Sequence, residues 1–421
     1  MTRAAAAMHA DLHSSAYAGW AARIRAELVG NVLPFWPRYV LDRRNGGFFG
    51  TVGPDLDVRQ ESLRASVVNS RILWTYAAAA RLIDVSWRET ADWAFDYLVR
   101  HVWDADEGGL YWMVDAHGAP VAAHKQTYAQ AFGIYALAEY HRATGDRDSL
   151  GLAKQLYALI EQHCADSVHP GYFEARGRAW QPLDDMRLSD KDLNCPKSMN
   201  THLHVLEAYT NLLRVWPDET LKARQRELLL VMMDHIIDSE TGHFRLFFDE
   251  AWKSLSDHVS FGHDIEGSWL LVEAAEVLGD PALLKRAQTL ALLMADVAAD
   301  QALDEDGSLV YEADGEGRLI DVRKHWWVQA EAVVGFYNAF ELSGETRFQT
   351  ASQRAWNYIE DHIVDRVHGE WHAKLSREGI ALTEAEDPDA VLVGPWKCPY
   401  HNARVCYEML ERLGRSENKT P

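Results

Sequence analysis

A histidine and a glutamate three residues apart stand out in the stretch SFGHDIEGSW at residues 260–269. The stretch reads as the start of a helix with Ser260 as its N-cap, and the spacing places His263 and Glu266 on one helix face. A helix N-terminus disfavours the charged imidazolium, so His263 is expected to stay neutral and available as a general base. Taken alone, a capping histidine beside a solvated glutamate explains the stretch better, so other parts of the chain must decide.

Three further stretches are polar and aromatic where a helix core should be apolar. They read KSMNTHLHVLEAY at residues 197–209, KHWWVQAE at 324–331 and GPWKCPYHNAR at 394–404. In the first, Asn200 and His204 are four residues apart and share a helix face, whereas His202 lies on a different face. The last one adds Trp396 and His401. Together with the stretch at residues 260–269, these three stretches supply the candidate residues for chemistry.

A metal site is the first chemistry that these residues suggest, because His202 and His204 are potential zinc or iron ligands. Residues two apart on a helix diverge, so the pair cannot chelate one ion, and no metal is expected. The chain has no G-x-S-x-G elbow for a serine nucleophile. It also lacks the glycine-rich phosphate-binding motifs, so no nucleotide cofactor is expected either.

An inverting glycoside hydrolase is the main enzymatic alternative, with Asp264, Glu266 or Glu331 as its two carboxylates. Histidine stands at the expected cleft end of three of the four stretches, whereas carboxylates do so in two. Two histidines that face each other across a sugar suit the removal and return of a proton at carbon. The balance therefore favours proton transfer over cleavage of a glycosidic bond.

Composition restricts the partners of this chain of 421 residues. Its formal net charge of -21, without a basic cluster, disfavours nucleic acid and anionic membranes as partners. No apolar run approaches the ~20 residues of a membrane span, and four scattered cysteines fit a reducing, cytoplasmic location. The 16 tryptophans and 16 tyrosines offer apolar ring faces on which a small-molecule sugar can pack.

The elements that must position these residues come from an internal repeat. Apolar residues at helical spacing recur along most of the chain, for example over residues 66–82, 125–144 and 202–216. Between the helices, an aspartate followed by a glycine and an aromatic or apolar pair recurs six times, beginning at residues 42, 104, 166, 238, 304 and 365. Six helical hairpins of about 60 residues predict a single all-α (α/α)6-barrel domain over residues 1–421, with short flexible ends near 1–15 and 414–421. An open α-solenoid is the alternative.

Long strings of the chain resemble the N-acylglucosamine 2-epimerase superfamily. They include NVLPFW (31–36), NSRILWTY (69–76) and the histidine-bearing stretches given above, and the resemblance covers nearly the whole chain. It implies an (α/α)6 barrel and reversible C2 epimerisation of the reducing-end glucose or mannose of β-1,4-linked disaccharides such as cellobiose, through a cis-enediolate and without a cofactor. The alternative within the superfamily is 2-epimerisation or ketose isomerisation of free mannose or glucose.

The resemblance also implies roles for individual residues. His263 and His401 would be the acid and base, with His204 assisting near the carbonyl and Arg71 holding the enediolate oxygens. The implied substrate-binding residues are Asn200, Glu266, Tyr128, Trp326, Trp327 and Trp396. Because neighbouring residues of a regular element point to different sides, only one of the tandem tryptophans is expected to face the sugar.

Overall fold

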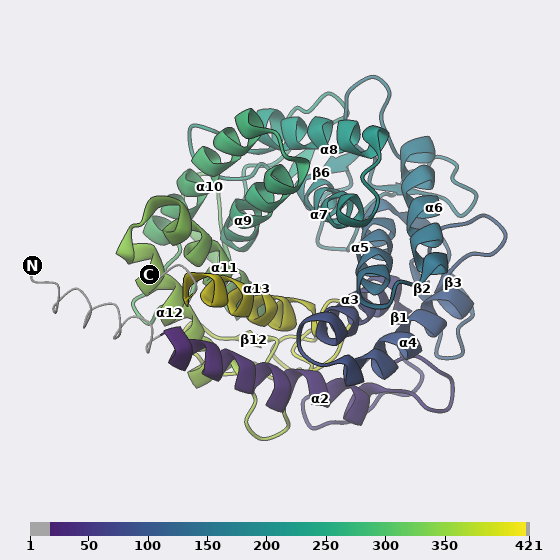
Figure 1. The fold of residues 1–421 in the computed structure, drawn as a ribbon, viewed down its shortest axis with the longest axis horizontal. Helices are drawn as coiled ribbons and strands as arrows, with labels where there is room; N and C mark the ends of the chain where they lie inside the picture. The colour runs from purple at the N-terminus through teal and green to yellow at the C-terminus, as the bar shows by residue number, and fades with distance from the viewer. Residues whose placement is uncertain (1–16, 418–421) are drawn as a thin grey trace, which may run out of the picture.

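The computed structural model describes residues 17–417 and forms a ring of helices in two layers (Figure 1). The inner helices are α3 (Ser66–Leu82), α5 (Thr127–Thr144), α7 (Met199–Val215), α9 (Phe261–Leu278), α11 (Trp326–Ser343) and α13 (Tyr400–Glu417). The outer helices are α4 (Arg88–Tyr97), α6 (Arg147–His163), α8 (Glu219–Val231), α10 (Pro281–Gln301) and α12 (Thr346–Tyr358). The helical segment of residues 17–40, which includes α2 (Leu33–Phe35), completes the outer layer.

The ring is closed by both ends of the described chain. Helix α13 packs between α11 and α3, and the N-terminal helical segment covers its outer side (Figure 1). This arrangement confirms the predicted (α/α)6 barrel, and the alternative of an open solenoid is wrong. Of the ends expected to be flexible, residues 414–417 continue α13, while residues 1–15 and 418–421 lie outside the described part of the chain.

The two layers differ in how their helices are buried. In the outer helix α6, the buried residues Ala153, Leu156, Tyr157 and Ile160 form one stripe, as expected for a helix with a solvent face. The inner helix α11 is instead buried almost all round, because neighbours flank it on both sides and an outer helix covers its back. Even so, no helix within residues 17–417 is both long and apolar enough to cross a membrane.

Three inner helices end at a glycine, and in two of these turns an aspartate caps the helix that follows. The glycines that follow α5, α9 and α11 adopt the left-handed conformation, with φ of 73° at Gly145, 76° at Gly279 and 74° at Gly344. Asp146 and Asp280 then cap the following helices through their side chains. Other outer helices widen into π-helical last turns, at Leu98–Val102, Met232–Ile236 and Ile359–Ile363. A 3-10 turn (Val85–Trp87) precedes α4, and the N-terminal segment contains the π-helical turns Leu28–Val32 and Trp36–Val40.

Short antiparallel strands tie the start of each of five inner helices to the loop of the next hairpin. The strands that precede inner helices are β1 (Arg64–Ala65), β4 (Lys125–Gln126), β6 (Lys197–Ser198), β8 (Val259–Ser260) and β11 (Lys324–His325). Their partners are β2 (Met113–Val114), β5 (Ala175–Arg176), β7 (Phe247–Phe248), β9 (Glu312–Ala313) and β12 (Lys374–Leu375), with β3 (Pro120–Ala122) and β10 (Leu319–Asp321) added at two edges. Registers such as Lys125↔Arg176 and Lys197↔Phe248 fix the helix starts against one another.

A buried basic residue precedes five of the inner helices and pairs with an acid of its own loop. The pairs are Arg64 with Asp42, Lys125 with Asp104, Lys197 with Asp166, Lys324 with Asp304, and Lys397 with Glu370. The repeat before α9 has Val259 at this position, and its loop residue Asp238 pairs with Arg245 instead. Removing one partner of a buried ion pair leaves an unpaired buried charge and strongly destabilises the fold, so these pairs hold the loops against the inner helices.

In four repeats, the polar side chain five residues after this basic position, or after Val259, binds the same loop. Gln130 accepts from Leu110 N and donates to Leu110 O, and Gln329 makes the same two bonds with Leu309. His202 accepts from Tyr172 N at 2.8 Å, which assigns this histidine to the framework. In α9 the position is Asp264, which accepts from Phe244 N at 2.8 Å. The repeat thus fixes which helix face binds the loop and which face is left for the cleft.

We expect Gln329→Leu to lower the free energy of unfolding by about 2 kcal/mol or more, because the N–H and C=O of the buried Leu309 lose their partners. Urea denaturation followed by circular dichroism measures the change. The exposed Gln162 on α6 gives the control Gln162→Leu, which should unfold like the wild type. Equal stability of the two variants would contradict a framework role for Gln329.

Candidate active site

A cleft of about 620 Å³ lies over the first turns of the inner helices. Its walls combine the starts of α7, α9, α11 and α13 with loop residues 186–193 and 394–397. The volume falls within the usual range of small-molecule sites, about 300–1,000 Å³. All ten candidate residues from the sequence line this one cavity: Arg71, Tyr128, Asn200, His204, His263, Glu266, Trp326, Trp327, Trp396 and His401.

His263 lies in the first turn of α9 and is held by Ser260. The Ser260 hydroxyl is 2.7 Å from His263 Nδ1 and makes no cap bond to the helix backbone, although Ser260 is the N-cap residue. Burial lowers the pKa of His263 to about 3, and the nearby His204 adds to this shift. The imidazole is therefore neutral near pH 7. Its Nε2 atom has no hydrogen-bond partner within residues 17–417, which leaves it free to receive a proton from a ligand.

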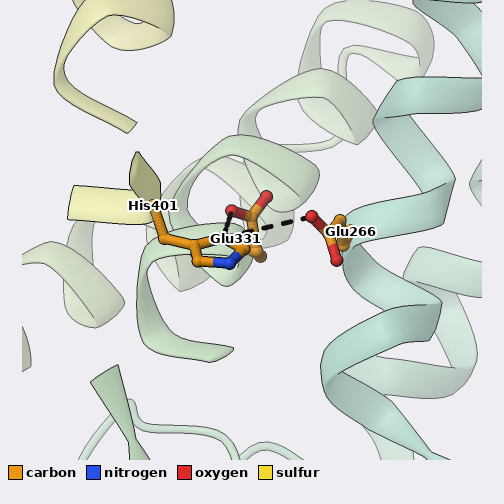
Figure 2. A group of neighbouring side chains, drawn as sticks. All are labelled: Glu266, Glu331 and His401. Carbon is orange, nitrogen blue, oxygen red and sulfur yellow. Dashed lines mark hydrogen bonds and ion pairs between the residues drawn. The ribbon is translucent and has the colours of Figure 1, made fainter. Parts of the chain in front are cut away.

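His401 lies in the first turn of α13 and faces the same cavity. Its Nδ1 atom is 2.7 Å from Glu331 Oε1 and 4.0 Å from Glu266 Oε1. Figure 2 shows the imidazole nitrogen directed at the Glu331 carboxylate, with Glu266 beyond it. Burial holds the pKa of His401 well below its usual value, and the positive charge of Arg404 lowers it further. As with His263, the contact at Nδ1 leaves Nε2 available.

The rings of His263 and His401 are linked by one tryptophan. The Trp327 ring centroid is 4.8 Å from that of His263 and 5.6 Å from that of His401. Trp326 also contributes to the lining of the cavity, so both residues of the pair take part in its wall. The reason is that α11 begins at Trp326 and the cavity lies over this first turn.

Arg71 brings a buried positive charge to the cavity wall. It is 3% exposed, and its Nη2 donates to Tyr128 Oη at 2.8 Å. The guanidinium lies over the rings of Phe132 and Tyr400, at 4.2 and 4.8 Å from their centroids. Within residues 17–417 no carboxylate forms an ion pair with Arg71. Because an unpaired buried charge is costly, this cation is prepared for a negatively charged ligand atom.

The remaining predicted residues complete the walls. The Oδ1 atom of Asn200 is buried and has no hydrogen-bond partner in the described part of the chain, so it can accept from a ligand hydroxyl. His204 Nδ1 is 2.9 Å from Glu207 Oε2, and burial lowers the pKa of His204. Trp396 stands in the loop before α13, where its ring is 6.0 Å from that of Tyr128. Its face offers a packing surface for a sugar ring.

Arg404 was missed in the sequence and forms the centre of a buried cluster below the cavity. Its Nη1 donates to Glu207 Oε1, and its Nη2 donates to both Glu266 Oε1 and Glu331 Oε1. Glu207 has its pKa lowered to about 2, because Arg404 and His204 outweigh the effect of burial. Burial and the neighbouring Glu331 raise the pKa of Glu266 to about 8, against the opposing effect of Arg404. Burial likewise raises the pKa of Glu331.

The repeat register could have found this cluster. Seven residues after the buried base, or after Val259, five of the repeats carry a charged or titratable side chain: Arg71, His204, Glu266, Glu331 and Arg404. The repeat of α5 has Phe132 at this position. Since the register places all of these on the same face of their helices, the sequence contains the information that they meet at the centre of the ring.

One group of side chains has the spacing of a metal site. Ligand atoms of Glu266, Glu331 and His401 all lie within 4.8 Å of one another. However, the Arg404 guanidinium already contacts both carboxylates and supplies the positive charge that they need. We therefore describe this group as a guanidinium–carboxylate cluster.

Comparison with known proteins gives consistent relatives. Residues 47–392 match the family model of N-acylglucosamine 2-epimerase. The cellobiose 2-epimerase of Bacteroides fragilis is 44% identical over 388 residues, 92% of this chain and 97% of the relative. That of Ruminococcus albus is 38% identical over 391 residues, 92% of this chain and 98% of the relative.

A solved structure of the cellobiose 2-epimerase from Bacillus thermoamylovorans B4167 superimposes with a TM-score of 0.88 at 39% identity, covering 94% of this chain and 99% of that chain. Its match extends over the same ring of helices that carries the cavity. The chain belongs to the N-acylglucosamine 2-epimerase family and is an isomerase.

Proposed function

We propose that the protein reversibly epimerises C2 of the reducing-end glucose or mannose of β-1,4-linked disaccharides such as cellobiose. The observation that carries the proposal is the pair of neutral histidines, His263 and His401, which line one cavity and are both held at Nδ1. Relatives named cellobiose 2-epimerases that cover most of the chain support the choice of a disaccharide. A cavity that extends to Trp396 and the loop of residues 186–193 has room for a second sugar.

The chemistry begins with the open-chain form of the reducing sugar. One histidine takes the C2 proton on Nε2, and the electron pair of the C–H bond moves into a cis-enediolate whose negative oxygens face Arg71. His204 assists at the carbonyl oxygen. Rotation about C2–C3 then presents the other face of C2 to the second histidine, which returns a proton. Asn200 and Glu266 bind sugar hydroxyls, while Tyr128, Trp326, Trp327 and Trp396 form the walls.

The arrangement of the carboxylates argues against an inverting glycoside hydrolase. Such enzymes keep their two carboxyl groups about 6.5–9.5 Å apart to admit a water molecule, whereas oxygens of Glu266 and Glu331 lie within 4.8 Å. Both also bind the same Arg404 guanidinium. The third candidate, Asp264, is bound to His243 and the loop backbone.

Epimerisation in heavy water should place one solvent deuteron at C2 of the product, because the abstracted proton leaves the sugar before another is returned. NMR of the sugars after incubation with cellobiose measures this label, and EDTA in the buffer should leave its rate unchanged. A count of reducing ends distinguishes epimerisation from hydrolysis, because only hydrolysis would raise the number of reducing ends. Cellobiose and mannose that both stay protonated at C2 after long incubation would refute the proposal.

Substituting either proposed acid/base residue, as His263→Asn or His401→Asn, should lower kcat by about 10²-fold or more, the usual effect of losing a general acid or base. Initial rates with cellobiose measure the change, and KM should move much less. The exposed His117 gives a matched control, since His117→Asn removes an imidazole at a solvent-exposed site. A variant of His263 or His401 with wild-type kcat would remove that residue from the mechanism.

The basic side chains along the cavity wall indicate a preference for uncharged sugars. Apart from Arg71, those within the described residues already pair with carboxylates: Arg187 with Asp185, Lys191 with Asp389, Arg323 with Asp321, Lys374 with Asp387, and Lys397 with Glu370. A phosphate at the mouth would therefore meet neutralised cations in a strongly acidic protein.

We expect kcat/KM for cellobiose phosphorylated on the non-reducing glucose to be lower by about 10-fold or more than for cellobiose. A methyl ether at the same oxygen controls for size. Asp389→Asn should reduce the difference in kcat/KM between the two sugars. It leaves Lys191 without its carboxylate partner and removes one of the two carboxylate partners of Lys374. Equal use of the phosphorylated and unmodified sugars by the wild type would contradict this preference.

A further inference from the structure

The two proposed acid/base histidines have different partners at Nδ1. His401 contacts Glu331, which binds Arg404, and Arg404 in turn binds Glu207, the partner of His204. A continuous chain of contacts therefore joins His401 to His204 through one guanidinium. His263 stands outside this chain, since its Nδ1 contacts the Ser260 hydroxyl. One histidine is thus supported by a titratable group and the other is not.

On the basis of the proposed epimerisation, we infer that Glu331 is a positioning residue that passes a proton to and from Nδ1 of His401. Glu331 and Glu266, which share the Arg404 guanidinium, together hold this proton between turnovers. The geometry supports the transfer because Glu331 Oε1 and His401 Nδ1 are only 2.7 Å apart. Figure 2 shows that no other labelled group lies between them.

Each proton transfer of the relay is balanced within the site, and between turnovers solvent takes the proton abstracted by His263 and restores the one given up by Glu331. When His401 acts as acid, the N–H bond at Nε2 breaks and a C–H bond forms at C2 of the enediolate. At the same time Nδ1 takes the proton of the Glu331 carboxyl, so the imidazole remains neutral and Glu331 becomes a carboxylate. In the opposite direction His401 takes the C2 proton on Nε2 and releases its Nδ1 proton to Glu331. A histidine that is hard to protonate can therefore still act as a general acid.

The charges around the carboxylates explain where the proton resides. Three buried glutamates face one guanidinium, so full ionisation would leave excess negative charge in a dry site. Glu207 is the ionised member, with its pKa lowered to about 2. Glu266 and Glu331 both have raised pKa values because of burial. The charged and titratable groups that act on Glu331 are Arg404 and His401 from α13, Glu266 and His263 from α9, and Glu207 from α7. Around these partners stand Tyr400 from α13 and His204 from α7, both at Glu207, and Arg71 from α3, which acts on Glu266.

The environment of Glu331 is also suited to changes in its charge. Its Oε2 accepts from Trp269 Nε1 at 3.0 Å, and its Oε1 accepts from Arg404 at 2.7 Å. These donors stabilise the carboxylate that remains after proton transfer. Glutamine at this position would keep one carbonyl oxygen for Arg404, but its NH2 group would replace the oxygen that accepts from Trp269, and it could not gain or lose a proton. The pH profile of kcat therefore separates a relay from a purely orienting contact.

We expect Glu331→Gln to reduce inversion at C2 by about 10²-fold, the scale of a lost general acid or base, with little change in KM. His263 should still abstract and return a proton on its own side. One of the two epimers should therefore exchange its C2 proton with heavy water without inversion, which NMR detects. The control is Glu408→Gln on α13, which also removes a carboxyl group whose pKa burial raises, but one whose ion pair is with Arg412 and not with Arg404 or His401. This variant should invert C2 like the wild type.

The pH dependence gives an independent readout that needs no variant. The wild-type kcat should fall as pH rises through about 8, because Glu266 and Glu331 then lose the shared proton. Glu331→Gln should lack this fall. A wild-type kcat that stays flat between about pH 6 and about pH 10, or a folded Glu331→Gln enzyme that inverts C2 at the wild-type rate, would overturn the relay. Absence of C2 exchange in the wild type would instead overturn the proposed function itself.

Discussion

The ion cluster around Arg404 is the contact on which the centre of the barrel depends. Its guanidinium comes from α13, whereas the carboxylates come from α7, α9 and α11. Each of these charges is buried, and a buried charge is tolerated only when its partners are in place. The four helices must therefore meet at one depth and one rotation. The same requirement fixes His204 and His401, because their Nδ1 atoms contact two of these carboxylates.

The loops at the cleft end are subject to a second constraint. Each hairpin must expose long Gly-aromatic loops and still keep them rigid enough to shape a cavity. Buried base–acid pairs such as Lys125 with Asp104, and side chains such as Gln130, attach the loops to the inner helices. The residues that line the cavity lie on the face of each helix that is not used for this attachment. Within the first turns of the inner helices, residues that attach the loops and residues that line the cavity therefore occupy different positions of the repeat.

The sequence predicted the barrel because the repeat is a property of the chain itself. Helical spacing and the six recurring aspartates determine the hairpins, and α3 begins and ends where the apolar pattern does. The two-residue strands are too short to leave a pattern of their own. For the site, the resemblance pointed to His263 and His401. The repeat register brings Arg404 to the level of Glu266 and Glu331, but its pairing with Glu207, which lies outside the register, depends on how the helices pack. The orientation of Trp326 depends on where the cavity lies over α11, which spacing alone does not reveal.

Closure of the ring by α13 has a consequence for biosynthesis. His401, Arg404 and the inner wall between α11 and α3 all belong to this helix. During translation the other inner helices leave the ribosome first, and they must wait with uncovered apolar flanks until α13 emerges and packs between them. The outer cover of α13, residues 17–40, is made before the other helices of the ring and must stay in place until α13 packs against it. A nascent chain therefore gains its closed core and its complete set of proposed acid/base residues in the same late event.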